Sequence, residues 1–357
     1  GLAILHRLGV SHELIELAAP ITALHGRTRG GRLVLDVKYR DLHPALQGLG
    51  MQRAAMSASL LRTMHRAGVT LIENRRIDSV TQAEGHCEAI GPGDQRSGPF
   101  DLVIIADGAR STCRASALPP SLVRRSKRYP WGALWWMAPP LGDLAADELR
   151  QVYAGTRQMI GFLPSGRAAP GEPELESCFW SVPARNWQGP DEFDLDRWKA
   201  EAIDLTPRVE PLVREIAHAD ELVFAPYYDV VLKRPYHGRV AVIGDAAHAT
   251  SPQLGQGVNL GLLDAATLAD AIASEASIDA ALARYARERH AQTRYYQRMS
   301  RLLTPVFQSG LPAISKLRDL AFGPACRFGL SKRQMLLALA GLKTGFLGAD
   351  RAEQYLS

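Results

Sequence analysis

Two apolar runs have a continuous hydrophobic pattern, and the first of them suits a strand that is buried on both faces of a parallel sheet. One run covers Val240 to Ile243 and ends at Gly244-Asp245. The other covers residues 101–106 (Asp-Leu-Val-Ile-Ile-Ala) and ends at Asp107-Gly108. Each run therefore brings an acidic residue to the carboxyl end of a strand, which is the edge where open α/β sheets bind their ligands.

The segment after Asp245 has the pattern of a loop followed by a helix. Pro252, Gly255 and Gly257 interrupt regular structure, and a helical pattern then runs from about Val258 to Ile272. Glycine lets a backbone approach a ligand closely, and a helix N-terminus carries positive partial charge. We expect Asp245 and this helix N-terminus to face one crevice that suits a ligand with both hydroxyl groups and negative charge.

The remaining pattern predicts short strands and hairpins followed by a helical C-terminal part. Strand-like residues flank Gly30-Gly31 between Ile21 and Val37, which predicts a hairpin, and Gly91-Pro92-Gly93 predicts another turn after the strand-like residues 77–90. Helical patterns, some of them ended by glycine, cover residues 1–8, 53–67, 197–216 and most of 273–357. Val69 to Ile72 is expected to be a strand.

Composition places the chain among ordinary globular proteins. It has 357 residues, of which 46% are hydrophobic and 22% charged, so there is ample chain for more than one structural unit. The cysteines are isolated, which argues against a metal site or a disulfide framework and favours a reducing, cytoplasmic compartment; they are Cys87, Cys113, Cys178 and Cys326. The apolar run from Met335 to Leu342 is too short to span a bilayer.

The net charge is +5, and arginine supplies most of the positive charge. Residues 124–128 (Arg-Arg-Ser-Lys-Arg) are the densest cluster, but nucleic-acid binding requires a longer stripe with interleaved aromatic residues. We interpret the cluster as a solvated strand edge. Its positive charge could also attract a nicotinamide dinucleotide, which is negatively charged. Ala313 to Phe328 places apolar beside basic residues, so it is either a packed helix, which we favour, or a peripheral membrane face.

The paired motifs, strand–Asp107-Gly108 and strand–Gly244-Asp245 with Pro252 and Gly255-Gln256-Gly257, resemble those of the flavin-dependent aromatic hydroxylases. These are single-component monooxygenases with the p-hydroxybenzoate hydroxylase fold. The likeness extends to residues 46–68 and 150–183. Family members open with a strand–Gly-x-Gly-x-x-Gly–helix unit, whereas this sequence opens on a helical pattern. We therefore expect either a piece of a longer enzyme or a remnant that binds flavin poorly.

The resemblance implies an α/β fold, α+β overall. An incomplete doubly wound FAD-binding domain carries an inserted, mostly β substrate domain and a helical C-terminus. The predicted parts are residues 1–114 and 233–280 for the FAD-binding domain, with hairpin 21–37 joining the substrate sheet, residues 115–232 for the substrate domain, and residues 281–357 for the C-terminal helical region.

The resemblance also assigns roles to individual residues. Asp245 would accept a hydrogen bond from a ribityl hydroxyl of FAD, and the helix N-terminus would stabilise the anionic reduced ring. Asp107 and Gly108, with Arg110 less firmly, would brace the pyrophosphate, and Arg53 would reach the phosphates or the ring edge. The residues expected beneath the isoalloxazine ring are Pro252, Gly255, Gln256, Gly257, Val258 and Asn259.

Each of these residues also has an ordinary structural interpretation. Aspartate often fills turns and helix caps, glycine is common in loops, and a first-turn arginine is often only solvated. His248 lies near Asp245, but we interpret it as fixing the loop and not as a base. No protein acid or base can be assigned, and no metal is expected.

The implied function is hydroxylation of an aromatic or polycyclic substrate with NAD(P)H and O2 through a flavin C4a-hydroperoxide. Two alternatives stay open: a flavin halogenase or reductase of the same fold, and a non-catalytic remnant. Trp135-Trp136 are adjacent and lead to Ala-Pro, unlike the spaced tryptophans of halogenases. Most substrate-domain aromatics should be sheet core, and some should line the substrate pocket; they are Trp131, Trp135, Trp136, Phe162, Phe179, Trp180 and Trp187. The sequence leaves the oligomeric state open.

Overall fold

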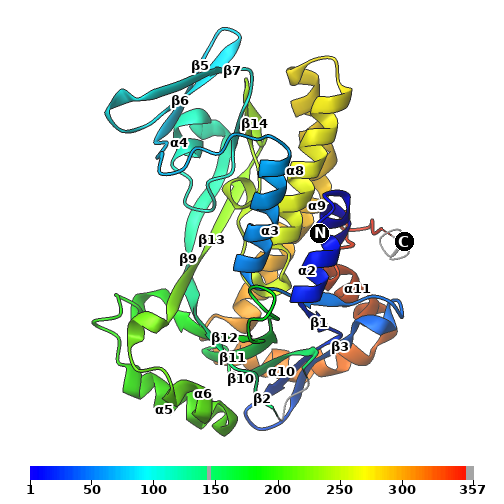
Figure 1. Cartoon of the computed structure of the whole chain (residues 1–357). Helices are drawn as coiled ribbons and strands as arrows, with labels where there is room; N and C mark the ends of the chain where they lie inside the picture. The colour runs from blue at the N-terminus through cyan, green and yellow to red at the C-terminus, as the bar shows by residue number, and fades with distance from the viewer. Residues whose placement is uncertain (143–145, 351–357) are drawn as a thin grey trace.

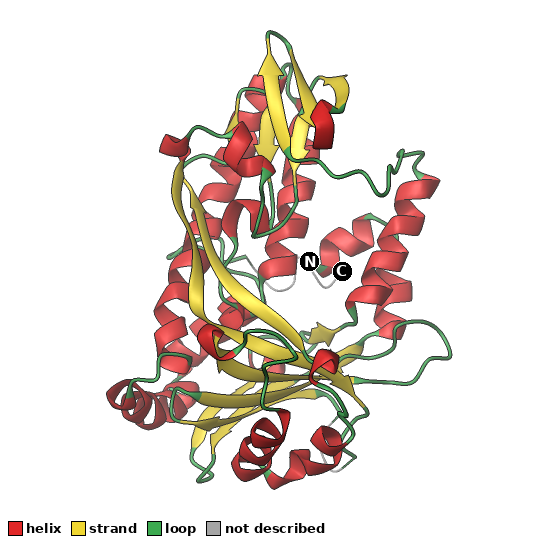
Figure 2. Ribbon diagram, turned by 90° about the vertical axis from the view of Figure 1, so that its left-hand side faces the viewer, coloured by secondary structure: helices red, strands yellow, loops and turns green. Residues whose placement is uncertain are grey.

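The computed structural model describes residues 1–142 and 146–350 and divides into two halves (Figure 1). One half, here called the large-sheet half, is built on a seven-stranded sheet. The other, here called the motif half, contains two three-stranded sheets and carries both acidic motifs. A long two-stranded ribbon connects the two halves, as Figure 2 shows in side view.

The seven-stranded sheet has mostly antiparallel neighbours, and only β10 and β2 run parallel. The hairpin expected around Gly30-Gly31 forms its edge. In spatial order the strands are β13 (Val223–Leu232), β9 (Val123–Ala138), β12 (Glu176–Pro183), β11 (Gln158–Pro164), β10 (Glu148–Ala154), β2 (Ala23–Thr28) and β3 (Leu33–Lys38).

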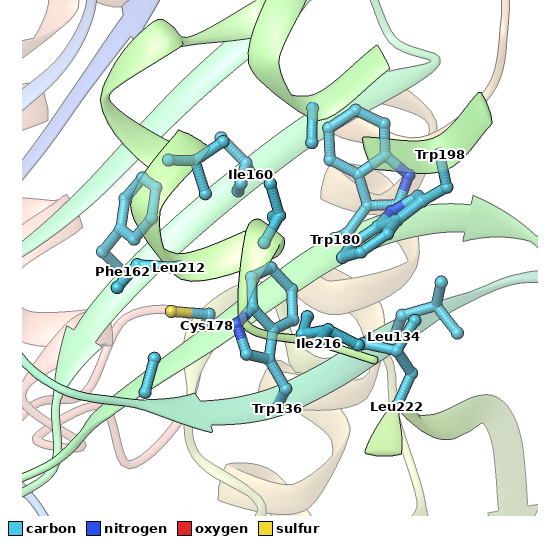
Figure 3. Close-up of a cluster of buried hydrophobic side chains, with 14 of the residues drawn as sticks. Leu134, Trp136, Ile160, Phe162, Cys178, Trp180, Trp198, Leu212, Ile216 and Leu222 are labelled. Atoms are coloured by element: carbon cyan, nitrogen blue, oxygen red, sulfur yellow. The ribbon is translucent and has the colours of Figure 1, made fainter. Parts of the chain in front are cut away.

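One face of this sheet is covered by α5 (Leu195–Leu205) and α6 (Glu210–Arg214). Asp194 caps α5 by accepting a hydrogen bond from the backbone N–H of Arg197 at 3.0 Å. Trp198 of α5 meets Trp136 edge to face at 5.4 Å between ring centroids (Figure 3). Such a pair adds about 0.5–1.5 kcal/mol beyond the area it buries. The predicted helical stretch 197–216 is thus two helices that close the core of the sheet.

The aromatic residues expected in the substrate domain are mostly core, as predicted. Trp135 and Trp187 are half-buried, and the other five are buried; these are Trp131, Trp136, Phe162, Phe179 and Trp180.

In the motif half, the central strand is buried on both faces, as its continuous apolar run predicts. Val240, Ala241 and Val242 are all fully buried. The first sheet has the order β14 (Tyr236–His237), β15 (Val240–Val242), β8 (Val103–Ile105), and β15 pairs parallel with β8. The second is antiparallel: β5 (Ser79–Ala83), β6 (His86–Ile90), β7 (Arg96–Phe100).

The longer helices stand beside the ribbon or lie against the large sheet (Figure 1). The shorter elements are α1 (Leu2–Arg7), α2 (Ser11–Leu17), α4 (Cys113–Ala117), α7 (Asp245–His248) and the small pair β1 (Ala19–Ile21) and β4 (Gly48–Gly50). The longer helices are α3 (Arg53–Arg66), α8 (Gly257–Ser274), α9 (Ile278–Phe307), α10 (Pro312–Arg327) and α11 (Gly329–Leu339). The C-terminal region predicted to be helical over residues 281–357 is helical as far as Leu339 and then forms turns and a β-bridge between Lys343 and Ala349. Residues 351–357 of this region lie outside the described residues, as do residues 143–145 of the predicted substrate domain.

One predicted strand is wrong. Val69, Leu71 and Ile72 form no strand and are 51%, 40% and 64% exposed. A β-rich run becomes a strand only where a neighbour completes its hydrogen bonds, and no described strand pairs with this run.

The basic cluster at residues 124–128 lies on the ribbon, where β9 pairs only with β13. This is the solvated strand edge that we expected, although Arg125 also forms an ion pair with buried Asp229 at 3.3 Å. Helix α10 packs against β3, while Leu317 and Leu320 on it remain exposed. Among the described residues, no helix combines the length and the apolarity needed to cross a bilayer.

Candidate functional site

The parallel pairing of β8 and β15 brings the two acidic motifs to one edge of the sheet. Ile105 pairs with Val242, so Asp107 and Asp245 follow neighbouring strand ends. Both side chains are exposed there. Asp107 also accepts a hydrogen bond from the backbone N–H of Cys113 at 3.4 Å, at the start of α4. Part of its role is therefore the local capping that an aspartate at a turn commonly performs.

The loop after β15 needs glycine at its first position. Gly244 has φ 58° and ψ −144°, a conformation that residues with a Cβ rarely adopt. This turn starts α7 at Asp245 and leaves the carboxylate of Asp245 exposed while Ala246, Ala247 and His248 are buried behind it. The backbone thus presents one acidic side chain at the sheet edge.

The loop before α8 presents exposed backbone beside Asp245. A single 3-10 turn covers Pro252–Leu254, Gly255 then takes the left-handed conformation (φ 64°), and α8 begins at Gly257. A Cβ placed on Gly257 would lie 3.8 Å from Oδ1 of Asp245. The N-terminus of α8 and the carboxylate of Asp245 therefore adjoin each other. Pro252, Gly255, Gly257 and Val258 are exposed along this stretch.

Gln256 and Asn259 have side chains that are used inside the protein. Gln256 is 7% exposed, and its side-chain N–H donates to the carbonyl of Leu339 at 2.8 Å. The side chain of Asn259 donates to Oε1 of Gln256 at 2.9 Å. These side chains fix the loop to α11, so any contact of Gln256 with a ligand in the crevice would be made by its backbone.

Arg53 begins α3, as predicted, with an exposed side chain for which the structure describes no partner. Met51 and Met56, on either side of it, belong to one apolar cluster with Leu262 of α8. The start of α3 is thereby held near the first half of α8. Gly108 has φ 83°, and Arg110 is exposed beyond it.

Two buried residues that the sequence analysis did not single out hold the motifs in place. Arg114 donates to the carbonyl of Ala246 at 2.6 Å and to that of Ala109 at 3.4 Å, so it connects the two loops. Burial lowers the pKa of its guanidinium. No sequence pattern identifies such a residue, because its partners lie far apart along the chain.

Asp264 is the second of these residues and is completely buried in α8. Its carboxylate accepts from the backbone N–H of Gly244 at 2.9 Å, from Nε2 of His248 at 2.5 Å and from Nε of Arg289 at 2.7 Å. His248 thus fixes the loop, in agreement with its interpretation from the sequence. An aspartate on the apolar side of a predicted helix is the signal that could have indicated Asp264.

Burial raises the pKa of Asp264, but the charges and hydrogen bonds of His248 and Arg289 outweigh burial, so its pKa lies below the ordinary value. The carboxylate is therefore ionised at neutral pH. It anchors the turn that presents Asp245.

The exposed groups at this edge of the sheet suit the ribityl and ring portions of a flavin. The N-terminus of α8 has no side-chain cap, so its first backbone N–H groups are available to an anionic acceptor. Asp245 supplies an acceptor for hydroxyl groups next to them, and Gly255 and Gly257 leave room for a flat ring above the backbone. Among the described residues, no group of His, Cys, Asp or Glu is arranged to hold a metal ion.

The large sheet reaches this loop through α9. Gln253, next to Pro252, donates to Oε1 of Gln308 at 2.9 Å, and Gln308 donates to Oγ of Ser181 on β12 at 2.6 Å. Trp135 and Phe179, whose ring centroids lie 4.9 Å apart, belong to one cluster of apolar side chains on the large sheet. The loop before α8 therefore lies opposite an aromatic sheet face.

Comparison with known proteins shows the family to which the chain belongs. Residues 1–299 match the FAD binding domain family. The chain therefore belongs to the FAD-binding family of the flavin-dependent aromatic hydroxylases and monooxygenases, which confirms the resemblance seen in the motifs, with FAD as the cofactor.

Its relatives and structural neighbours include enzymes of that kind. A probable 2-heptyl-3-hydroxy-4(1H)-quinolone synthase of Rhodococcus erythropolis, AqdB2, is 28% identical over 84% of this chain and 76% of its own length. The 2-heptyl-3-hydroxy-4(1H)-quinolone synthase of Pseudomonas aeruginosa is 27% identical over 72% of this chain, and the match covers 60% of that relative. Klebsiella pneumoniae HpxO, in a crystal structure with FAD and uric acid, has the same fold: the TM-score is 0.76 at 19% identity, over 97% of this chain and 86% of HpxO.

Proposed function

We propose that this protein hydroxylates a flat aromatic or polycyclic substrate, using FAD, NAD(P)H and O2. The relatives named as quinolone synthases make a fused, nitrogen-containing aromatic ring the first substrate class to test. The observation that carries the proposal is the convergence of Asp107, Asp245 and the N-terminus of α8 on one edge of the β8–β15 sheet.

In this proposal the protein residues bind and orient, and bound FAD supplies the redox and oxygen chemistry. Asp245 accepts from a ribityl hydroxyl and fixes the position of the flavin along the sheet edge. The N–H groups at the start of α8 would stabilise negative charge on the ring of reduced FAD, which would favour the reduced form. Gly108 and Arg53 remain proposed contacts to the pyrophosphate side.

The substrate would lie between this ring and the aromatic sheet face. Half-buried Trp135 offers apolar ring surface, and Met137 on the same strand is 44% exposed. Ser181 and Gln308 are each 2% exposed and are hydrogen-bonded to each other, so they hold the sheet and the loop together and do not line this surface. A flat apolar ring matches the surface that Trp135 and Met137 provide.

A halogenase or reductase of the same fold and a non-catalytic remnant are the competing functions. A halogenase or reductase would use the electrons of reduced FAD without adding oxygen to the substrate. A non-catalytic remnant would bind FAD weakly and consume no NAD(P)H. These outcomes separate in one assay, because hydroxylation places an oxygen atom from O2 in the product.

The test uses the purified chain, FAD, NADPH or NADH, and 2-alkyl-4-quinolones as probes under 18O-labelled O2. We expect saturable FAD binding, NAD(P)H oxidation that the quinolone stimulates, and one labelled oxygen in the product. FAD binding without labelled product for any aromatic probe would contradict the hydroxylase proposal.

The Asp245→Ala substitution tests the site itself. Loss of a charge-assisted hydrogen bond to a ribityl hydroxyl costs about 1.5–3 kcal/mol, so FAD affinity should fall roughly tenfold or more. Quenching of FAD fluorescence measures this affinity. Asp191→Ala, at an exposed position in the large-sheet half, is the matched control and should bind FAD like the wild type. Equal affinity for Asp245→Ala and the wild type would show that Asp245 does not contact the cofactor.

A further inference from the structure

A concave site lies next to the segment that carries Asp245, because Ala247 and His248 of that segment line it. It is a cavity of about 350 Å³ between the segment Leu232–Pro235, which follows β13, and the outer part of α9. Buried His248 and Asp264 contribute to its floor. Asp107, Asp245 and Gly257 do not line it, so the cavity is separate from the proposed flavin crevice.

The walls of this cavity are cationic. Arg287, His290 and Arg294 follow one another at spacings of three and four residues, so they share one face of α9. Lys233 and Arg234 face them from the segment after β13. Cationic groups thus line the cavity from both sides.

These charges are not neutralised by neighbouring carboxylates. The one acidic residue in the lining is Asp264, which is already bound to His248 and Arg289. For Lys233, Arg234, Arg287 and Arg294 the structure describes no ion pair. Arg294 lies 3.3 Å from Nε2 of His290, and Arg234 lies over the ring of Tyr236 at 4.7 Å. Four formal positive charges therefore surround the cavity without an acidic partner.

Concentrated positive charge in a recess has a cost that an anionic ligand removes. Like charges repel in the folded state, and a concave wall focuses their field on whatever enters. The guanidinium groups can donate paired hydrogen bonds to phosphate oxygens, and the ammonium group of Lys233 can act as a point charge. A flat basic surface would lack the concave volume seen here.

We propose that this cavity binds a small molecule through a diphosphate group. A diphosphate group carries more than one negative charge at neutral pH and has oxygen atoms on both phosphorus atoms, so cations on both sides of the cavity can bind it at once. Its floor consists of the His248–Asp264 pair that anchors Gly244, so the site adjoins the base of the candidate active site. The proposal does not depend on the flavin site, because diphosphate binding can be measured without FAD.

The probe is inorganic pyrophosphate, titrated calorimetrically into the full chain at low ionic strength. We expect saturable binding at one site per chain. The double substitution Arg287→Gln with Arg294→Gln should weaken the affinity at least tenfold. Arg32→Gln with Arg185→Gln is the control: both arginines are exposed in the large-sheet half, and the change in net charge is identical. This control should remain within about twofold of the wild type.

Three results would overturn the proposal. The first is absence of saturable binding to the wild type. The second is equal weakening in the two double variants, because this would show a response to net charge only. The third is binding to vesicles that contain phosphatidic acid when free pyrophosphate neither binds nor competes, because this would assign the cations to a membrane surface. Should the Arg287→Gln/Arg294→Gln protein fail to fold, Arg287→Gln alone, at an exposed position, should still weaken binding about threefold.

Discussion

Asp264 shows how one buried side chain sets the geometry of a whole site. Its carboxylate accepts hydrogen bonds from the backbone N–H of Gly244 in the turn after β15, from His248 of α7 and from Arg289 of α9. Removing one member of such a buried network leaves the others unpaired in a medium of low dielectric constant. The position of Asp245 at the sheet edge therefore depends on a residue that does not itself reach the crevice.

We predict that Asp264→Asn is strongly destabilising. It leaves the buried guanidinium of Arg289 without its counter-charge, which costs about 3–5 kcal/mol in the free energy of unfolding. Urea unfolding at pH 7 measures this difference. Asp191→Asn, at an exposed position, is the control and should change stability by less than about 0.5 kcal/mol.

The wild type and the Asp264→Asn variant also allow a test in acid. The folded-state pKa of Asp264 lies below its ordinary value, so its contribution is complete above the unfolded pKa of about 3.9 and is lost as pH falls through the folded-state value. The stability gap between wild type and Asp264→Asn should therefore persist down to about pH 4 and narrow below it. A gap that stays constant to pH 2 would contradict the assigned ion pairs.

At the scale of elements, the turn before α8 separates the demands of folding from those of binding. Gly255 needs its left-handed conformation, whereas Gly257 is the first residue of a helix. A methyl group on Gly257 would meet only Oδ1 of Asp245, at an ordinary contact distance of 3.8 Å. The two glycines are therefore present for different reasons.

We predict opposite effects of alanine at these two glycines. Gly255→Ala should lower the free energy of unfolding by about 1–2 kcal/mol, because a residue with a Cβ is strained in the left-handed region. Gly257→Ala should leave stability unchanged or slightly higher but weaken FAD binding severalfold, because its methyl group enters the crevice. Chemical unfolding and FAD titration of both variants measure this. Equal FAD affinity for Gly257→Ala and the wild type would place the flavin elsewhere.

Local patterns predicted most of the elements, whereas the contacts between distant elements could not be predicted. The β2–β3 hairpin, α3 and α8 follow from glycine turns and periodicity, which are properties of short segments. Val69–Ile72 failed because a strand also requires a partner. Arg114 and Asp264 were missed, and the side chains of Gln256 and Asn259 turned out to face α11, because these roles depend on residues far away in the sequence.

At the scale of the whole molecule, two long elements hold the halves together. Helix α9 extends over about 45 Å at 1.5 Å per residue. Near one end, Tyr285 donates to the carbonyl of Val242 in the motif half at 3.1 Å; just beyond its other end, Gln308 donates to Ser181 in the large sheet. The β9–β13 ribbon forms a second connection. We therefore expect the two halves to unfold as one unit.

The distribution of tryptophan makes this expectation testable. All six tryptophans lie between residues 131 and 198, in the large-sheet half, whereas the proposed FAD contacts lie in the motif half. A ligand that binds only the folded state at about a hundred times its Kd stabilises that state by about 2.7 kcal/mol. If the halves are coupled, saturating FAD raises the free energy of unfolding that tryptophan emission reports in urea by this amount. Asp245→Ala should remove most of this increase at the same FAD concentration.

Far-ultraviolet circular dichroism reports on both halves, so it should give the same urea midpoint as tryptophan emission, with and without FAD. A tryptophan transition that FAD leaves in place, while the circular dichroism splits into two steps, would show that α9 and the ribbon do not couple the halves.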